Sequence, residues 1–101
     1  MQKTLLATAL GLLAVAPAMA DQALASSKSC MGCHAVQRKV VGPAFKDVAA
    51  KYRTDKTAVE HLSRKIQQGG SGVWGRVTMP AHPQLSDTDA RKLAVWILSV
   101  P

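Results

Sequence analysis

The sequence predicts an all-α domain of about four helices, and three observations lead to that fold class. Apolar residues recur every three or four positions in several segments, as they do along one face of a helix. Capping residues and glycines lie at the ends of these segments. No convincing strand pattern is found in the chain.

Residues 1–20 have the composition of a secretory signal. One lysine precedes an apolar run of 13 residues, 4–16, and the PAMA that follows offers the small residues that signal peptidase recognises. The run is shorter than the roughly 20 residues that span a bilayer, so we expect cleavage before Asp21 and no stable membrane insertion afterwards. Residues 21–101 would then form one domain in an oxidising compartment. A leader without a lipobox cysteine indicates a bacterial periplasm.

Four segments of the mature chain are expected to be helical. They cover residues 21–30, 44–52, about 56–68, and a last stretch opened by Ser86-Asp87-Thr88-Asp89. Thr54 or Asp55 can cap the third helix, and Gly69-Gly70 stops it. The last helix begins with a capping-box variant that places acids at its positive end. One face of that helix is apolar and consists of Leu93, Trp96, Ile97 and Val100.

The 16 residues from 69 to 84 have no predicted regular structure. An irregular segment of that length is uncommon inside a small domain, and is often functional where it does occur. We therefore expect functional residues in this stretch.

The mature chain has few aromatic side chains with which to build a core. Only four remain in it, and 81 residues are marginal for a self-sufficient interior. Its net charge is +6, because residues 1–20 remove one of the 13 basic residues and none of the six acidic ones. Export and the lack of a basic stripe interleaved with aromatics argue against nucleic acid as a partner. We expect another body to complete the core.

Both cysteines of the chain lie in CMGCH, residues 30–34. A disulfide here would close a very short loop and restrain the unfolded chain little. A thioredoxin-like pair would follow a strand, and a zinc site would need ligands that the chain does not offer at the usual spacing. Attachment of one haem c fits every constraint, because Cys30 and Cys33 can add to its vinyl groups and His34 can bind its iron. The haem would also supply the missing hydrophobic centre.

The second axial position of such a haem has few candidate ligands. Met31 lies inside the attachment loop, on the proximal side. Met79 lies in the long loop and is followed by Pro80, which favours ligation over a role as core filler. Lysines also compete for this position and His82 is the serious rival, whereas His61 is expected to be a solvated side chain of the third helix.

Three stretches cover nearly the whole mature chain: CMGCHAVQRKVVGPAFKDVAAKY, QQGGSGVWGRVTMP and LAVWILSVP. Together they resemble the small bacterial class I cytochromes c of the cytochrome c-551 type, the cytochrome c8 or c-551/c-552 group. The resemblance implies the class I cytochrome c fold, with about four helices around one covalently attached haem. It also implies His/Met ligation and one-electron transport in the periplasm.

The resemblance assigns roles to the residues that hold the haem. Cys30 and Cys33 form the thioether bonds, His34 is the proximal ligand and Met79 the distal one. The carbonyl of Pro43 is expected to accept a hydrogen bond from the proximal imidazole, which orients the ring and raises its basicity.

Further residues around the haem follow from the same resemblance. Trp74 matches a tryptophan that reaches a haem propionate, and Lys65 matches a basic position with the same role, which Arg64 could share. Trp96 matches the residue by which the last helix packs on the first. The sequence departs from the family at His82, where many members have an asparagine that donates a hydrogen bond to the methionine sulfur.

Two strong axial ligands leave no open site for substrate, so we expect an electron carrier rather than an enzyme. The resemblance implies redox protein partners: a donor such as a membrane cytochrome complex, and an acceptor such as nitrite reductase or an oxidase. We expect a monomer. Two alternatives stay open. Easy dissociation of Met79 would give a ligand sensor or weak peroxidase, and replacement of Met79 by His82 would give a bis-histidine haem protein of lower potential.

Overall fold

The computed structural model describes residue 11 and residues 17–101 of the chain. In chain order its elements are α1 (Pro17–Ser27), the 3₁₀-helix η1 (Cys30–Gly32), α2 (Phe45–Lys51), α3 (Ala58–Gln68), β1 (Gly70–Gly72), β2 (Gly75–Met79) and α4 (Asp87–Leu98). The predicted signal, residues 1–20, lies outside the described residues except for residue 11 and the first turn of α1. In the described part, no helix has both the length and the apolarity needed to cross a membrane.

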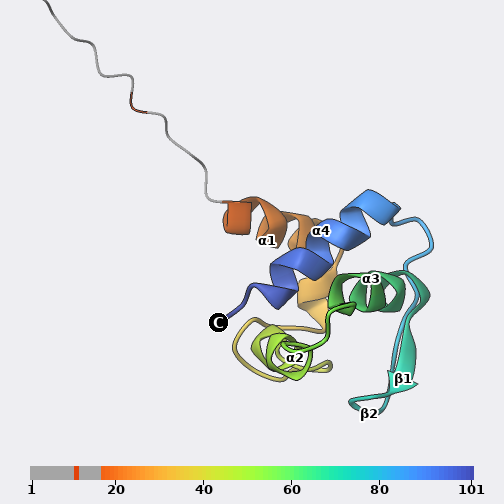
Figure 1. Ribbon diagram of the computed structural model, residues 1–101. Helices are drawn as coiled ribbons and strands as arrows, with labels where there is room; N and C mark the ends of the chain where they lie inside the picture. The colour runs from red at the N-terminus through yellow and green to blue at the C-terminus, as the bar shows by residue number, and fades with distance from the viewer. Residues whose placement is uncertain (1–10, 12–16) are drawn as a thin grey trace, which may run out of the picture.

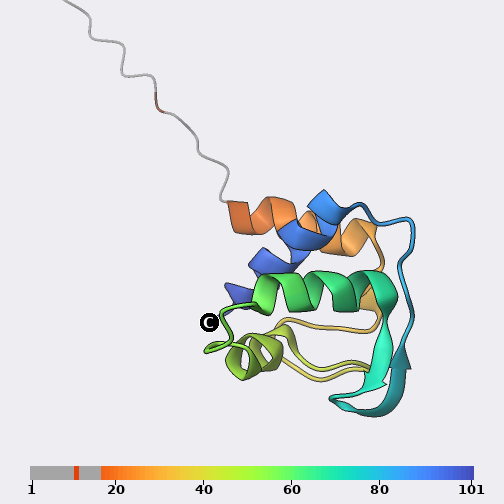
Figure 2. The same ribbon diagram turned by 45° about the vertical axis from the view of Figure 1, so that its right-hand side comes forward.

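Helix α4 is the central element of the fold. The helices α1, α2 and α3 each pack against it, and α4 lies between α1 and α3 in Figure 1 and Figure 2. Its predicted start is confirmed, because the hydroxyl of Ser86 accepts a hydrogen bond from the backbone amide of Asp89. The predicted apolar face is buried in full: Leu93, Trp96, Ile97 and Val100.

The first three helices differ from the predicted ranges at their ends. Helix α1 begins at Pro17 instead of residue 21, and α2 covers Phe45–Lys51 instead of residues 44–52. Helix α1 ends at Ser27 instead of residue 30, because Ser29 takes a left-handed backbone conformation with φ of 64° and the chain turns into η1. Helix α3 begins at Ala58, two residues later than predicted. The carboxylate of Asp55 binds the backbone amide of Thr57 at 2.8 Å and so holds the turn that precedes α3.

The prediction that residues 69–84 have no regular structure is wrong. The strands β1 and β2 pair antiparallel, with Gly70 opposite Met79 and Gly72 opposite Gly75. The two glycines at the tip have φ of 105° and 114°, a conformation that favours glycine and permits the tight turn. The hairpin extends from the C-terminal end of α3, on the side of the molecule away from α1 (Figure 1).

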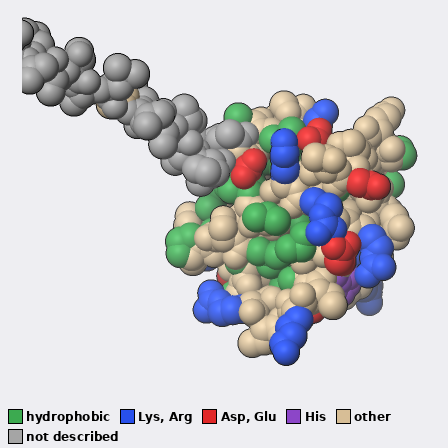
Figure 3. Space-filling model, turned by 45° about the horizontal axis from the view of Figure 1, so that its top comes forward, with side chains coloured by type: hydrophobic (Ala, Val, Ile, Leu, Met, Phe, Trp, Pro, Cys, Tyr) green, Lys and Arg blue, Asp and Glu red, His purple; other side chains and the backbone are tan. Residues whose placement is uncertain are grey.

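The surface carries charges of both signs. On the face shown in Figure 3, basic and acidic side chains are interspersed around a small apolar area. Between α3 and α4, Arg91 forms a salt bridge with Glu60. On this face, therefore, the excess of basic residues does not form one continuous patch.

The carboxylate of Asp55 is stabilised in its charged form. The backbone amide and the hydroxyl of Thr57 both donate hydrogen bonds to it, each at 2.8 Å, and His61 lies 3.6 Å away. The backbone bond and then the hydroxyl bond lower the pKa of Asp55 below its ordinary value of 3.8. A group with a lowered folded-state pKa contributes stability at neutral pH, and that contribution is lost as the pH falls through the folded-state pKa.

We predict that Asp55→Asn flattens the acid side of the stability profile. The wild-type protein loses this contribution below about pH 4, whereas the amide does not titrate. Urea unfolding midpoints measured between about pH 7 and about pH 3 check this. Thr57→Val keeps the backbone donor and should give an intermediate slope. Parallel profiles for the three proteins would contradict the prediction.

Candidate functional site

The two cysteines and His34 are presented by a tight turn that follows α1. The backbone amides of Cys33 and His34 both donate to the carbonyl of Cys30, at 3.2 and 3.0 Å. Cys33 is exposed and Cys30 is partly buried. Burial raises the pKa of the Cys30 thiol, and a hydrogen bond with its own backbone opposes that shift. The turn therefore brings two thiols and an imidazole together within five residues of sequence.

The imidazole of His34 is fixed by three neighbours. Its Nδ1 lies 2.8 Å from the carbonyl oxygen of Pro43. A carbonyl only accepts, so Nδ1 carries the proton and Nε2 keeps the lone pair that a metal needs. The ring of Phe45 stacks on the imidazole, with centroids 4.8 Å apart and planes 17° apart. A Cβ on Gly42 would lie 2.8 Å from Nδ1, 2.9 Å from Nε2 and closer still to Cε1, so only glycine fits against this ring.

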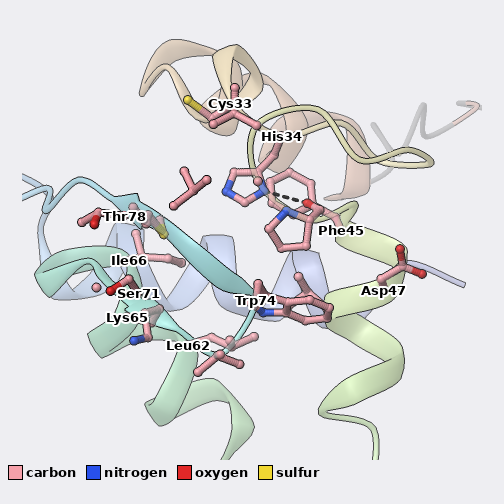
Figure 4. Close-up of a pocket in the computed structure, with 18 of the residues that line it drawn as sticks. Cys33, His34, Phe45, Asp47, Leu62, Lys65, Ile66, Ser71, Trp74 and Thr78 are labelled. Atoms are coloured by element: carbon pink, nitrogen blue, oxygen red, sulfur yellow. Dashed lines mark hydrogen bonds between the residues drawn. The ribbon is translucent and has the colours of Figure 1, made fainter.

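The His34 ring borders a cleft of about 280 Å³. Figure 4 shows Cys33 and His34 on one side of it, and Ile66, Leu62 and Trp74 on the other. The lining is mostly apolar and includes Val41, Leu62, Ile66, Val73, Val77 and Ile97. Lys39, Asp47 and Lys65 are its charged members. The cleft therefore suits a flat, apolar body with a charged edge.

Among Met79, His61 and His82, the methionine and histidine candidates for the second axial position, only Met79 lines the cleft. Lys39 and Lys65 also line it. Met79 is the last residue of β2. His61 is exposed, as the sequence predicts. His82 caps the end of α3 instead: its Nδ1 donates to the carbonyl of Ile66, and its backbone amide donates to the carbonyl of Gln67, both at 2.9 Å.

The chain after β2 is held close against the end of α3. A Cβ on Gly69 would lie 2.8 Å from both the Pro80 carbonyl carbon and the Ala81 nitrogen, and closer still to the Met79 oxygen. The φ of Gly69 is 68°, which also favours glycine. The absence of a side chain at this position thus sets where the backbone of Met79 can lie.

The rim of the cleft carries the other predicted residues. Trp74 lies at the tip of the hairpin, 44% exposed, with Nζ of Lys51 5.7 Å from its ring centroid. Lys65 lines the cleft and reaches over Gly70, whose Cβ would lie 2.9 Å from its Nζ. Arg64 is exposed and does not line the cleft. Of the two basic residues that could reach a haem propionate, Lys65 therefore lines the cleft and Arg64 does not.

Sequence reasoning missed two residues that position His34. Phe45 was not singled out, although it links the imidazole to the core by stacking edge-on against Trp96, with centroids 5.3 Å apart and planes 74° apart. Gly42 directly precedes Pro43, and nothing in the sequence pattern marks it as the residue that leaves room for the imidazole. The available signal was an aromatic residue two positions after the Gly42-Pro43 turn. Trp96 itself is buried, as expected for a core residue.

The comparison with known families decides what these residues belong to. The sequence matches the family described as cytochrome c over residues 19–101. The chain belongs to the cytochrome c family. It is 50% identical to cytochrome c-552 of Hydrogenobacter thermophilus, over 99% of each chain. It is 44% identical to cytochrome c-551 of Pseudomonas aeruginosa, over 95% of this chain and 91% of the other.

Solved structures of cytochromes share the fold. The crystal structure of wild-type Nitrosomonas europaea cytochrome c552 superposes with a TM-score of 0.77 at 49% identity, covering 79% of this chain and 99% of that one. The class 1 cytochrome MtoD from Sideroxydans lithotrophicus gives 0.70 at 29% identity, covering 81% and 94%. The predicted class I cytochrome c fold is confirmed, with the β1–β2 hairpin added to its four helices.

Membership of this family fixes the cofactor and the general activity. Cytochromes c carry covalently bound haem c, and the chemistry of the cleft fits it: two thiols, an imidazole with a free Nε2, a thioether and an apolar lining. This cytochrome is a small haem-c electron carrier with redox proteins as partners. It is an electron-transfer protein and not an enzyme.

We predict that Gly42→Ala displaces the His34 ring. The new Cβ would clash with three ring atoms, so the imidazole must move or the loop must open, at a cost of about 1–3 kcal/mol. The check is the unfolding midpoint together with the reduction potential of the holoprotein. Gly32→Ala, in η1 of the attachment turn, is the control, because its Cβ would meet nothing within 4 Å. Equal effects of the two substitutions would contradict the prediction.

Proposed function

We propose that this cytochrome carries single electrons in the periplasm, between respiratory complexes and a terminal reductase. One haem c would be attached through Cys30 and Cys33 and bound axially by His34 and Met79. The observation that carries this proposal is the cleft, which is lined by both His34 and Met79 from two separate elements. No other histidine or methionine of the described chain lines it.

The protein residues tune the site in three ways. The haem, when bound, supplies an iron that gains and loses one electron. The hydrogen bond from His34 to Pro43 orients the imidazole and raises the basicity of Nε2. The thioether of Met79 is a soft ligand that favours the reduced metal and so raises the potential. The apolar lining keeps water from the site and further favours the state of lower charge.

The arrangement of His82 supports methionine over histidine as the distal ligand. Its Nδ1 proton is committed to the Ile66 carbonyl and its backbone to Gln67. These bonds leave Nε2 of His82 with a lone pair, but they hold the ring at the end of α3 and outside the lining of the cleft, so a bis-histidine site would require this segment to move. The close packing of Gly69 against Met79 supports a ligand held in place, which disfavours a sensor or peroxidase that works by losing it.

Lys65 and Trp74 are proposed to meet the haem carboxylates. Both line the cleft, and Lys65 brings a cation to its edge. An indole Nε1–H can only donate, which suits a carboxylate acceptor. Arg64 lies outside the lining and is left out of the proposed site.

Electron exchange is proposed to occur at the exposed rim of the cleft. With both axial positions taken by protein ligands, a partner can reach the cofactor only at its edge. We propose a monomer that meets a donor such as a membrane cytochrome complex and an acceptor such as nitrite reductase or an oxidase.

We predict that the oxidised protein shows the weak charge-transfer band that sulfur bound to ferric haem gives in the near infrared. Met79→Ala should abolish the band, and His82→Ala should retain it, because only Met79 lines the cleft. A visible to near-infrared spectrum of each purified holoprotein checks this. A wild-type protein without the band, or a band lost in His82→Ala alone, would contradict the proposed ligand set.

Residues 1–20 are proposed to be a signal that is removed on export, which leaves the domain 21–101. We predict that a bacterial host able to attach haem c yields periplasmic protein that begins at Asp21. Intact mass and N-terminal sequencing measure this, with Ala20→Asp as the variant expected to block cleavage. Periplasmic holoprotein that retains residues 1–20 would overturn the proposed boundary.

A further inference from the structure

The two ends of the β1–β2 hairpin are attached to the body of the protein very differently. At its base, Gly69 packs under the Met79 carbonyl, and His82 makes two hydrogen bonds to the end of α3. Between residues 71 and 78, no hydrogen bond or ion pair joins the hairpin to a helix of the described chain. A two-stranded hairpin is marginally stable by itself, so its tip depends on contacts with other elements.

A cation–π contact reaches the tip from a helix: Nζ of Lys51 lies over the ring of Trp74, 5.7 Å from its centroid. Lys51 is the last residue of α2, and Trp74 stands between the two strands. Both side chains are exposed, so the ammonium stays hydrated and the attraction is weak. Its position matters more than its strength, because it bridges the cleft at the end of the hairpin farthest from α3.

The geometry makes the tip a lever on the distal ligand. Trp74 and Met79 belong to the same hairpin, one at the tip and the other at the end of β2. Gly69 precedes β1 and Gly70 begins it, with φ of 68° and 136°, and such residues can absorb backbone rotation. Strand β2 runs without a break from the residue after Trp74 to Met79, so a displacement of the tip would be transmitted along this strand to the distal ligand.

We propose that Lys51 is a positioning residue that latches the hairpin through Trp74 and so limits the release of Met79 from the iron. The inference rests on the proposed ligation by Met79 and adds a residue that controls it. Lys51 touches neither the haem ligands nor the attachment turn. Its effect is on how often the distal position opens.

The experiment measures the rate at which imidazole, a neutral ligand, binds the oxidised holoprotein at saturating concentration, where opening of the distal position limits the rate. Lys51→Met should raise this rate about two- to five-fold, the effect of losing an exposed cation–π contact. Lys51→Arg keeps a cation over the ring and should restore the wild-type rate. Lys46→Met is the matched control, because it removes the same charge from the same helix without facing Trp74.

A second readout separates the latch from a general loss of stability. Hydrogen exchange of the Trp74 indole N–H in the reduced protein should speed up by the same factor in Lys51→Met, while exchange in α4 stays unchanged. In a Trp74→Leu background, Lys51→Met should have no further effect on imidazole binding.

The outcomes distinguish this inference from the proposed function. Equal imidazole rates in wild-type, Lys51→Met and Lys46→Met proteins would overturn the latch while leaving Met79 ligation intact, provided the charge-transfer band is present. A rise of the same size in Lys46→Met would also overturn it, because the effect would then be one of net charge. Absence of the band from the wild-type protein would remove the proposed ligation and the latch together.

Discussion

The fold depends on burial of the apolar surface that lines the cleft. The helices already form one core, in which α4 is covered by the other three. A second set of apolar side chains faces the cleft and stays exposed there: Val41 at 50%, Val73 at 47% and Val77 at 67%. Exposed apolar surface in a chain this small is costly, and a porphyrin would cover it from both sides. The cofactor is therefore a structural part of the protein as well as its redox centre.

The end of α3 organises the distal side of that cleft. Gly69 lets the backbone of Met79 pass close by, and His82 satisfies carbonyls that the end of a helix leaves without partners. Gln67 extends the same arrangement, because its amide donates to the Leu85 carbonyl at 3.2 Å and to the Asp87 carboxylate at 2.7 Å. The segment between β2 and α4 is thus tied to one helix end. In many family members the residue at this position is an asparagine that donates a hydrogen bond to the methionine sulfur. His82 instead donates to the Ile66 carbonyl.

What could be predicted from the sequence was what depends on local chemistry. The start of α4 is predicted from the capping residue Ser86, and the structure confirms it. The buried face of α4 is predicted from apolar residues spaced three or four positions apart, and these residues are buried. The attachment motif is contiguous and pointed directly to haem. The hairpin was missed because its strands are short and rich in glycine, so they carry no alternating pattern and depend on pairing with each other. The partners of Phe45 and His82 come from distant parts of the chain, which spacing alone does not reveal.

The clamp around the proximal imidazole also bears on the speed of electron exchange. The ring of His34 is hydrogen-bonded to Pro43, stacked on Phe45 and backed by Gly42, and Phe45 is in turn wedged against Trp96 of α4. Side chains in such close packing have little room to shift when the charge beside them changes. The inner-sphere reorganisation energy on this side of the metal should therefore be small, and a carrier with that property can accept and release its charge without waiting for the protein to rearrange.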